Sequence, residues 1–355
     1  MRKIVIVCLM LLLGACSSET INPNSGSLIE SINQDDYAVL IPFDSSPIRD
    51  YHGTYLGRPD FMEVGSRLLD KSKAYFDPKD YYLSEGQILT PTLLGNLVKR
   101  ESSDNPYGLN PPSGSLFPSG NGEVTLLDAV IVADIVETDF YQGDSANPQL
   151  AGISFAIILN QTHTLEDGAQ ISITTDRLYT YGSDMGRKLE RYIRTLTDLE
   201  DMPLYITLYS TESMDSTLPG HFMGEGYFDG RSGQFSDNTE NWALFPSSQA
   251  SLQDPVIDAS FLIFRRDVQD FIPEAIGIIG EGRYVENDLD FLRLTLTIQA
   301  KTFTEVHALI QYVASLLEGF EQKNYVMIVK INSISETLAL IQRDLAGNIT
   351  VIEPY

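Results

Sequence analysis

Hydrophobic residues along the chain follow two distinct periods. From Leu292 to Ile298 every second residue is apolar, which is typical of a strand with one buried face. The next segment opens with the capping-box sequence Thr302–Glu305 and carries one apolar stripe, which predicts a helix over 304–317. Similar patterns predict strands at 37–41, 81–89, 124–136, 153–159, 204–209 and 325–331, and helices at 59–74, 183–196 and 259–272, with a further helix starting at Pro91 after the N-cap Thr90.

The predicted elements indicate an α+β fold with mixed or antiparallel sheets and scattered amphipathic helices. A strand, a helix and a strand follow one another between 153 and 209, and again between 292 and 331. This repeated order suggests two similar strand-helix-strand units. We place an N-terminal α+β subdomain at 37–118 and the main α+β domain at 119–355, and we read 101–122, rich in Ser, Asn, Pro and Gly, as a loop.

The first residues have the order of a secretory leader. Two basic residues precede an apolar run from Ile4 to Leu13, and the run ends in Leu13-Gly14-Ala15-Cys16. Ten apolar residues cover about 15 Å of helix, too little for roughly 30 Å of hydrocarbon. The last four residues resemble the bacterial lipobox, so we expect a signal peptide at 1–15 and a lipid on the Cys16 thiol. The alternative is an ordinary cleaved leader in which Cys16 is incidental.

Both cysteines of the chain lie within the leader region, as Cys8 and Cys16. A processed chain that starts at a lipidated Cys16 has no free thiol, which excludes disulfides and cysteine-based metal or catalytic sites. Residues 16–36 are polar and predict a flexible tether between the anchor and the folded part. The expected location is the outer face of the cytoplasmic membrane, with the membrane and the prolipoprotein-processing enzymes as partners.

The chain is strongly acidic, with a formal net charge of −25. Such a field repels nucleic acid and anionic polymers, so we expect no nucleic-acid partner. Acidic residues are so frequent that two neighbouring carboxylates carry little catalytic information.

No catalytic or metal-binding motif appears in the sequence. The four histidines, His52, His163, His221 and His307, are far apart and form no metal-binding pattern. The glycines of 220–226 lack the spacing of a phosphate loop and suit the turns or bulges of a hairpin. We therefore predict no cofactor, no metal and no enzymatic activity.

One predicted helix carries a basic face. Arg187, Arg191 and Arg194 share one side of 183–196, with Lys188 beside them. This side is either a polyanion-binding or membrane-facing stripe or, as we favour, a solvated face, because Asp184 and Glu190 precede basic residues at the i,i+4 spacing that favours ion pairs.

Several segments resemble the CamS family, the sex pheromone lipoproteins of low-GC Gram-positive bacteria. The resemblance runs from the lipobox to the C-terminal third. It rests on the segments 42–49 (PFDSSPIR), 85–87 (EGQ), 105–112 (NPYGLNPP), 152–154 (GIS), 277–280 (GIIG) and 311–314 (QYVA).

The resemblance implies a precursor with two products. The end of the leader is released as a short apolar pheromone peptide, and the mature lipoprotein stays on the membrane with a non-catalytic binding or scaffold role. Here the seven residues before Cys16 are Leu9-Met10-Leu11-Leu12-Leu13-Gly14-Ala15, which depart from the family's usual peptide.

The most promising candidate for a binding surface is the loop at 105–110. Its residues are Asn105, Pro106, Tyr107, Gly108, Leu109 and Asn110. Each Asn-Pro step favours extended backbone before the proline, so the loop can present Tyr107 and Leu109 rigidly to an envelope or cell-surface partner. The alternative is a loop that packs back on its own domain.

Two other functional classes remain open at this stage. A cell-envelope hydrolase would need a carboxyl pair about 5 to 9 Å apart in a deep cleft. A solute-binding lipoprotein of a transporter would need two lobes of alternating strands and helices.

Overall fold

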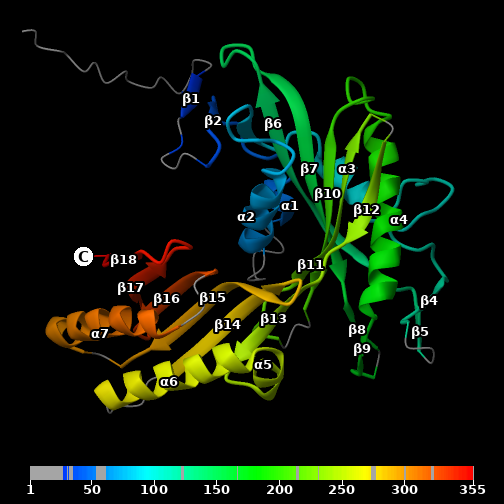
Figure 1. Ribbon diagram of the computed structural model, residues 1–355. Helices are drawn as coiled ribbons and strands as arrows, with labels where there is room; N and C mark the ends of the chain where they lie inside the picture. The colour runs from blue at the N-terminus through cyan, green and yellow to red at the C-terminus, as the bar shows by residue number, and fades with distance from the viewer. Residues whose placement is uncertain are drawn as a thin grey trace, which may run out of the picture.

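The computed structural model describes residues 27–29, 31, 35–52, 61–120, 124–165, 167–212, 216–230, 232–272, 277–299, 301–320 and 324–354. Within these residues the fold is α+β with large mixed sheets, as predicted (Figure 1). An eight-stranded sheet has the order β1-β2-β3-β6-β7-β10-β11-β12, and a six-stranded sheet has the order β13-β14-β15-β16-β17-β18. Two small hairpins, β4-β5 and β8-β9, complete the strands.

The first sheet and its hairpins span residues 27 to 237. The strands are β1 (Ser27–Ile29), β2 (Val39–Ile41), β3 (Tyr82–Glu85), β4 (Leu116–Pro118), β5 (Thr125–Leu127), β6 (Val132–Gln142), β7 (Gln149–Asn160), β8 (Thr162–Thr164), β9 (Gln170–Ser172), β10 (Leu204–Thr211), β11 (His221–Asp229) and β12 (Ser232–Asp237). The helices are α1 (Arg49–His52), α2 (Phe61–Ser72), α3 (Pro91–Leu97) and α4 (Thr175–Ile193).

The second sheet follows directly in the chain. Its strands are β13 (Glu240–Phe245), β14 (Gly277–Val285), β15 (Asp288–Thr297), β16 (Val326–Asn332), β17 (Thr337–Arg343) and β18 (Ile349–Ile352). Its helices are α5 (Ser248–Gln253), α6 (Pro255–Phe271) and α7 (Phe303–Leu316), followed by the 3-10 turn η1 (Leu317–Gly319). The predicted domain boundary at 118/119 falls inside the first part, whereas the two sheets separate between β12 and β13.

The two sheets repeat one topology. In the first, β3, β6 and β7 pair antiparallel, β7 pairs parallel with β10 across α4, and β10, β11 and β12 pair antiparallel. In the second, β13, β14 and β15 pair antiparallel, β15 pairs parallel with β16 across α7, and β16, β17 and β18 pair antiparallel. The strand-helix-strand similarity expected from the sequence therefore extends to six strands on each side.

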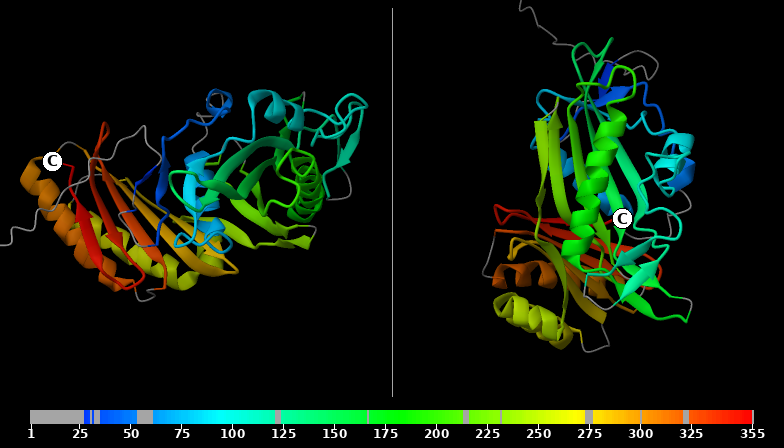
Figure 2. Two further views of the ribbon diagram at one scale, coloured as in Figure 1. Left: turned by 90° about the horizontal axis from the view of Figure 1, so that it is seen from above. Right: turned by 90° about the vertical axis from the view of Figure 1, so that its right-hand side faces the viewer.

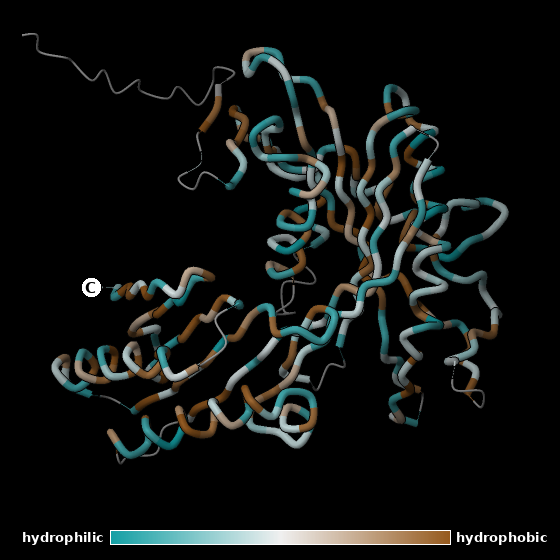
Figure 3. The backbone as a smooth tube through the Cα atoms, in the orientation of Figure 1, coloured by the Kyte–Doolittle hydropathy of each residue, from teal (hydrophilic) through white to brown (hydrophobic). Residues whose placement is uncertain are grey.

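Helices cover the two sheets differently. In the first sheet, α2 packs on one face and α3 and α4 pack on the other, so the sheet lies between two hydrophobic cores. In the second sheet, α6 and α7 pack on one face only, over a single core (Figure 2). Figure 3 shows the hydrophobic residues concentrated in the strands and on the helix sides that meet them.

A buried ion pair joins the two parts of the chain. Arg67 of α2 binds Glu240 at the start of β13 through both guanidinium nitrogens, and its guanidinium also lies over the Phe222 ring. Nearby, Trp242 of β13 donates its indole N–H to the Gly220 carbonyl at 3.1 Å. Charges inside a protein are stable only when paired, so α2 fixes the second sheet against the first.

Several predicted boundaries need correction. The apolar run at 124–136 is two strands rather than one, because Asp128 takes a left-handed conformation (φ 54°) between β5 and β6. The loop predicted at 101–122 contains the short strand β4, and Ser27–Ile29 of the predicted tether pairs with β2.

Two predicted helices also begin elsewhere. The helices predicted at 183–196 and 259–272 begin earlier, at Thr175 and at Pro255, after N-caps that the sequence analysis overlooked. The helix predicted at 59–74 is α2, whose described part is 61–72, and the capping box of α7 is present as predicted.

Candidate functional site

The predicted lipid-attachment site lies outside the described residues. Leu13, Gly14, Ala15 and Cys16 all precede residue 27, so the lipobox stays a sequence prediction. Among the helices that the structure describes, none combines the length and apolar character needed to cross a bilayer.

The loop 105–110 is tied tightly to the protein at its C-terminal end. The Asn110 side chain is buried, donates to the carbonyls of Val98 and Val132, and accepts the amides of Ile131 and Val132 at 2.7 and 2.8 Å. All the hydrogen-bonding capacity of this amide is therefore used internally. Asn110 anchors the loop and is unavailable to a partner.

The middle of the loop is packed just as closely. The Leu109 side chain is fully buried in the core between the first sheet and α4, and its carbonyl accepts the Tyr181 hydroxyl at 2.7 Å. A Cβ on Gly108 would lie 2.5 Å from the Arg100 carbonyl oxygen, so only glycine fits there. The prediction that Leu109 faces a partner is wrong, because this side chain fills space in the core between the first sheet and α4.

The tip of the loop remains available at the surface. Pro106 is exposed and Tyr107 retains 37% of its accessible surface. The Tyr107 ring packs against Tyr192 of α4 with 4.4 Å between centroids. Asn105 holds the tip from behind, because its side-chain amide donates to the carbonyls of Asn96 and Arg100. Of the six candidate residues, the structure thus presents Tyr107 and Pro106 outward.

The basic residues of α4 lie beside this tip and are largely occupied. Lys188 binds Glu101 and the Gly108 carbonyl, both at 2.8 Å, and Arg194 pairs with Glu190. Arg187 and Arg191 are exposed. The α4 face is thus partly an ion-paired surface, as favoured from the sequence, and it borders the tyrosine pair.

A second cluster, which the sequence analysis did not select, is a buried carboxyl pair on β6. Glu137 and Asp139 stand two residues apart on one face of the strand, beneath the turn at 86–89. The Glu137 carboxylate accepts the amides of Ile88 and Leu89 at 2.8 and 2.7 Å, and Asp139 accepts the amide of Gln87 at 3.0 Å. A weak signal existed, since the strand carries three acids, Asp134, Glu137 and Asp139, among apolar residues.

Burial dominates the electrostatics of this pair. Desolvation raises the pKa of Asp139 well above its usual range, and the neighbouring Glu137 carboxyl raises it further. Desolvation also raises the pKa of Glu137, although the amides that it accepts oppose the change. The pKa of the nearby Tyr141 rises to about 12, first by burial and then by the charges of Asp139 and Glu137.

The histidines are dispersed in the structure as in the sequence. His52 is buried and its Nδ1 lies 2.9 Å from the Asp134 carboxylate, while His221 and His307 lie near Glu212 and Glu353. Burial lowers the pKa of His163. Within the described part of the chain, no group of three His, Cys, Asp or Glu side chains is arranged to hold a metal ion.

The segment Gly220–Gly226 leads into and forms part of β11, which pairs with β10 across a bulge at Leu208/Tyr209. This placement agrees with the prediction that these glycines serve the turns or bulges of a hairpin. A Cβ on Gly224 would lie 2.6 Å from the Tyr179 ring, so the strand approaches α4 closely here.

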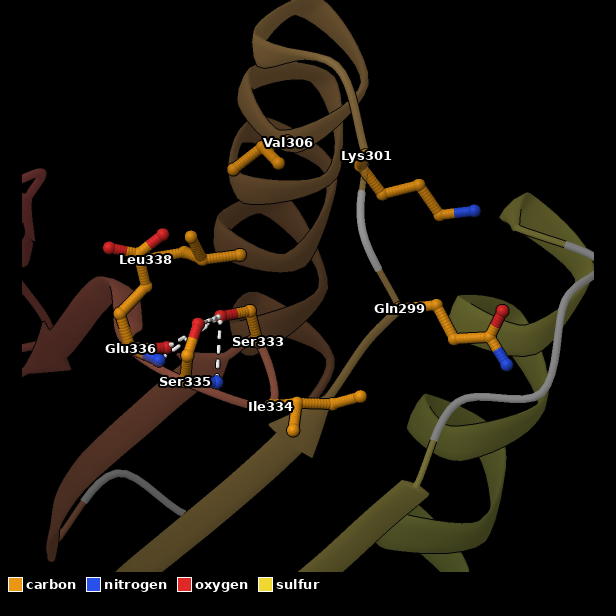
Figure 4. Close-up of a pocket in the computed structure, with 8 residues that line it drawn as sticks. All are labelled: Gln299, Lys301, Val306, Ser333, Ile334, Ser335, Glu336 and Leu338. Carbon is orange, nitrogen blue, oxygen red and sulfur yellow. Dashed lines mark hydrogen bonds between the residues drawn. The ribbon is translucent and has the colours of Figure 1, made fainter.

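A shallow pocket of about 240 Å³ lies in the second sheet at the carboxyl ends of β15 and β16 (Figure 4). Gln299, Lys301 and Val306 line one side, and the turn 333–336 lines the other. The polar groups of this turn bond to one another, since the Ser333 hydroxyl accepts the amides of Ser335 and Glu336.

These arrangements bear on the two alternatives left open by the sequence. The carboxyl pair of β6 is closed over by the 86–89 turn, whose amides it binds, unlike a glycosidase pair that flanks its substrate. Within the described residues the first sheet contains two parallel strand pairs, β2-β3 and β7-β10, and the second sheet contains one, β15-β16, with all other pairs antiparallel, unlike the two doubly wound lobes expected of a transporter's binding protein. Neither alternative is favoured.

Comparison with known proteins defines the class. The fold is that of a crystallised sex pheromone precursor from Lactobacillus salivarius subsp. salivarius UCC118, with a TM-score of 0.80 and 22% identity, covering 93% of this chain and 99% of that one. The C-terminal domain of the sex pheromone staph-cAM373 precursor from Staphylococcus aureus matches with a TM-score of 0.68 and 22% identity, covering 83% of this chain and 96% of that one.

The family model for the CamS sex pheromone cAM373 precursor matches residues 43–348. The chain therefore belongs to the CamS family, as the sequence motifs indicated. The family is described as a pheromone precursor and not as an enzyme class. No curated protein sequence matches the chain.

Proposed function

We propose that this protein is a lipid-anchored pheromone precursor of the CamS type, whose leader yields a short apolar peptide and whose mature domain is a non-catalytic binding module on the outer face of the membrane. The observation that carries the proposal is the order of basic start, apolar run and Leu13-Gly14-Ala15-Cys16 in a member of this family. The family itself suggests a secreted or surface protein.

Physical chemistry supports stable anchoring through one modified cysteine. Each acyl methylene buried in the bilayer contributes about 0.8 kcal/mol, so a diacylglyceryl group with an added N-acyl chain holds a protein where a single chain does not. With −25 formal charges, this protein gains no attraction to anionic headgroups. Lipid on Cys16 is then the only strong membrane contact in the proposal.

The binding surface that we assign to the mature domain is the tyrosine pair Tyr107 and Tyr192 with the neighbouring exposed arginines of α4. Support comes from the way the loop is built: Asn105, Gly108 and Asn110 hold its backbone, while Tyr107 stays half-exposed. Tyrosine and arginine are among the residue types enriched at the energetic centres of protein interfaces. The proposed partner is a protein of the cell envelope or of a neighbouring cell.

Lipid attachment is tested by Cys16→Ser. The variant is expected to move from the detergent-rich phase to the aqueous phase or to accumulate as the unprocessed precursor. Cys8→Ser is the matched control, because it removes the other cysteine and leaves the lipobox intact. Unchanged partitioning of the Cys16 variant contradicts the proposal.

Release of a peptide is tested by mass spectrometry of the culture medium. The expected species is Leu9–Ala15 or a shorter form with the same C-terminal end. If this peptide is absent while a processed membrane form begins at Cys16, the pheromone half of the proposal is contradicted and the anchored binding module still stands.

The binding surface is tested with a photo-crosslinking amino acid placed at Tyr107 in living cells. We expect one dominant crosslinked protein that does not form when the same amino acid replaces Leu345, which is exposed at 63% on the second sheet. Equal patterns from the two positions contradict the assignment of the tyrosine surface.

A further inference from the structure

The turn at 86–89 is fastened to β6 almost entirely by carboxyl groups. Three successive backbone amides, those of Gln87, Ile88 and Leu89, donate to Asp139 or Glu137. The turn lies so close to β6 that a Cβ on Gly86 would come within 2.6 Å of the Glu137 side chain. A carboxylate accepts such amides strongly, but two adjacent buried carboxylates also repel each other, so the number of protons that the pair holds determines how firmly the turn is held.

The hydrogen bonds around the pair indicate that Glu137 and Asp139 share one proton. Asp139 uses Oδ2 for the Gln87 amide, while its buried Oδ1 has no amide or hydroxyl partner. Each Glu137 oxygen accepts one amide and retains a second lone pair. A proton on Asp139 Oδ1 can therefore be donated to the Glu137 carboxylate, which pairs both groups and avoids two adjacent buried anions.

The surroundings provide no compensation for a second negative charge. Glu85 of β3 and Glu137 itself both act on Asp139 in the direction that retains its proton. Asp44, from the segment before α1, and Tyr141 of β6 are the other titratable groups of this region. His52 of α1 is the described base nearby, and its effect falls on Glu85.

The turn is connected to the tyrosine surface through α3. Leu89 precedes Thr90, whose hydroxyl caps α3 by accepting the Leu93 amide at 3.2 Å. At the other end of α3, the Asn96 carbonyl accepts the Asn105 side chain at 2.8 Å and the Leu97 carbonyl accepts the Leu109 amide at 2.7 Å. The turn is thus joined to α3 through the chain, and α3 to the loop through direct hydrogen bonds, so loosening the turn withdraws support from the loop.

We propose that Glu137 and Asp139 form a proton-controlled latch, closed when the pair holds one proton and loosened when both carboxyls are ionised. In the closed state the turn, α3 and the loop 105–110 are held to the first sheet. In the open state two buried anions repel each other and the amides of 87–89 exchange with water. The effect on partner binding rests on the function proposed for Tyr107, whereas the latch itself does not.

The direction of the pH effect follows from linkage. Both carboxyls have pKa values raised in the folded protein, so their contribution to stability is fully present at acidic pH. It is lost as the pH rises through the folded-state pKa of the pair. The latch is therefore closed in mildly acidic surroundings and loosens on the alkaline side.

The test combines two NMR measurements on the purified full chain, compared between about pH 6 and about pH 9. The side-chain carboxyl carbon of Asp139 is expected to titrate far above the ordinary carboxyl range. Protection factors of the Gln87, Ile88 and Leu89 amides are expected to fall about tenfold or more over this interval, while that of Leu294 in the second sheet changes little.

Asp139→Asn is the diagnostic variant, because its amide can donate permanently to Glu137 and still accept from Gln87. Its protection factors at 87–89 are expected to stay constant over the same range. Glu85→Gln, which leaves the pair intact, is the matched control and should retain the pH dependence.

The latch is overturned if the wild-type Asp139 carboxyl titrates near the usual value, or if Asp139→Asn loses protection with pH as the wild type does. The carboxyl titration needs no variant, so it decides the question even if Asp139→Asn fails to fold. If Tyr107 crosslinks no partner, the proposed binding surface is contradicted, but the carboxyl titration and the amide protection factors still test the latch.

Discussion

The two sheets share a strand order but differ in how many of their faces are covered. All residues of β10, Leu204–Thr211, are buried, whereas buried and half-buried residues alternate strictly along β16, Val326–Asn332. The helix α2 accounts for the difference, because it covers the face of the first sheet that has no covering helix among the described residues of the second. One connectivity thus supports both a three-layer and a two-layer packing.

The residue pattern of each strand follows from this packing. The strand β10 carries no charged residue, while β15 and β16 place Arg293 and Lys330 on the uncovered face. A strand buried on both sides excludes charge, and a strand buried on one side alternates. The amphipathic helix α2 packs Val64 and Leu68 against the first sheet, and this covering is why the strand β10 beneath it excludes charged residues.

The largest expected effect comes from removing the ion pair that joins the two parts. Arg67→Ala leaves Glu240 buried without its partner, so the free energy of unfolding is expected to fall by about 3 to 5 kcal/mol. Urea denaturation measures the change. The double variant Arg67→Met with Glu240→Leu removes both charges and should lose much less. Equal losses in the two variants would show that charge pairing is not what holds this junction.

Two isoleucines, one on the face of the first sheet that α2 covers and one on the uncovered face of the second sheet, test how much the covering helix contributes to stability. Ile158 of β7 faces α2 and is 7% exposed, whereas Ile328 of β16 is half-buried on the uncovered face. Ile158→Ala is expected to lower the free energy of unfolding by about 2 to 4 kcal/mol, and Ile328→Ala by about 1 kcal/mol or less. Thermal and urea unfolding give both values. Similar losses would mean that the second sheet is covered as fully as the first.

The smallest effect compares the two equivalent crossover helices. Thr302 caps α7 in a complete capping box, whereas Thr174 precedes α4 without a side-chain cap. Thr302→Ala is expected to destabilise the protein by about 1 kcal/mol, and Thr174→Ala by a few tenths at most. Urea unfolding midpoints distinguish the two. A larger loss at Thr174 would contradict the observed difference in capping.

Sequence patterns predicted two of the six strands of the second sheet, β15 and β16, and missed β13, β14, β17 and β18. The alternation from Leu292 to Ile298 and the capping box at Thr302 are local signals, and both are present in the structure. The start of α4 was missed because its first turns carry Thr, Asp, Arg and Tyr rather than an apolar stripe. The strands β17 and β18 were missed because short, mixed sequences gain their strand character only from neighbours.

The sequence drew attention to the loop 105–110 but did not predict the orientation of its side chains. The unusual Asn-Pro spacing identified the loop, yet whether Leu109 points inward depends on the space between the sheet and α4, which no local pattern encodes. The carboxyl pair was missed for a related reason. In a chain with 49 acidic residues, Glu137 and Asp139 become distinctive only once the 86–89 turn is seen to bury them.

The most direct measurement of the central claim is the intact mass of the protein extracted from cell membranes. We expect a chain that begins at Cys16 and carries the added mass of a diacylglyceryl group, with or without a further acyl chain. A membrane form with an unmodified cysteine, or with a different first residue, would contradict the lipid-anchored account.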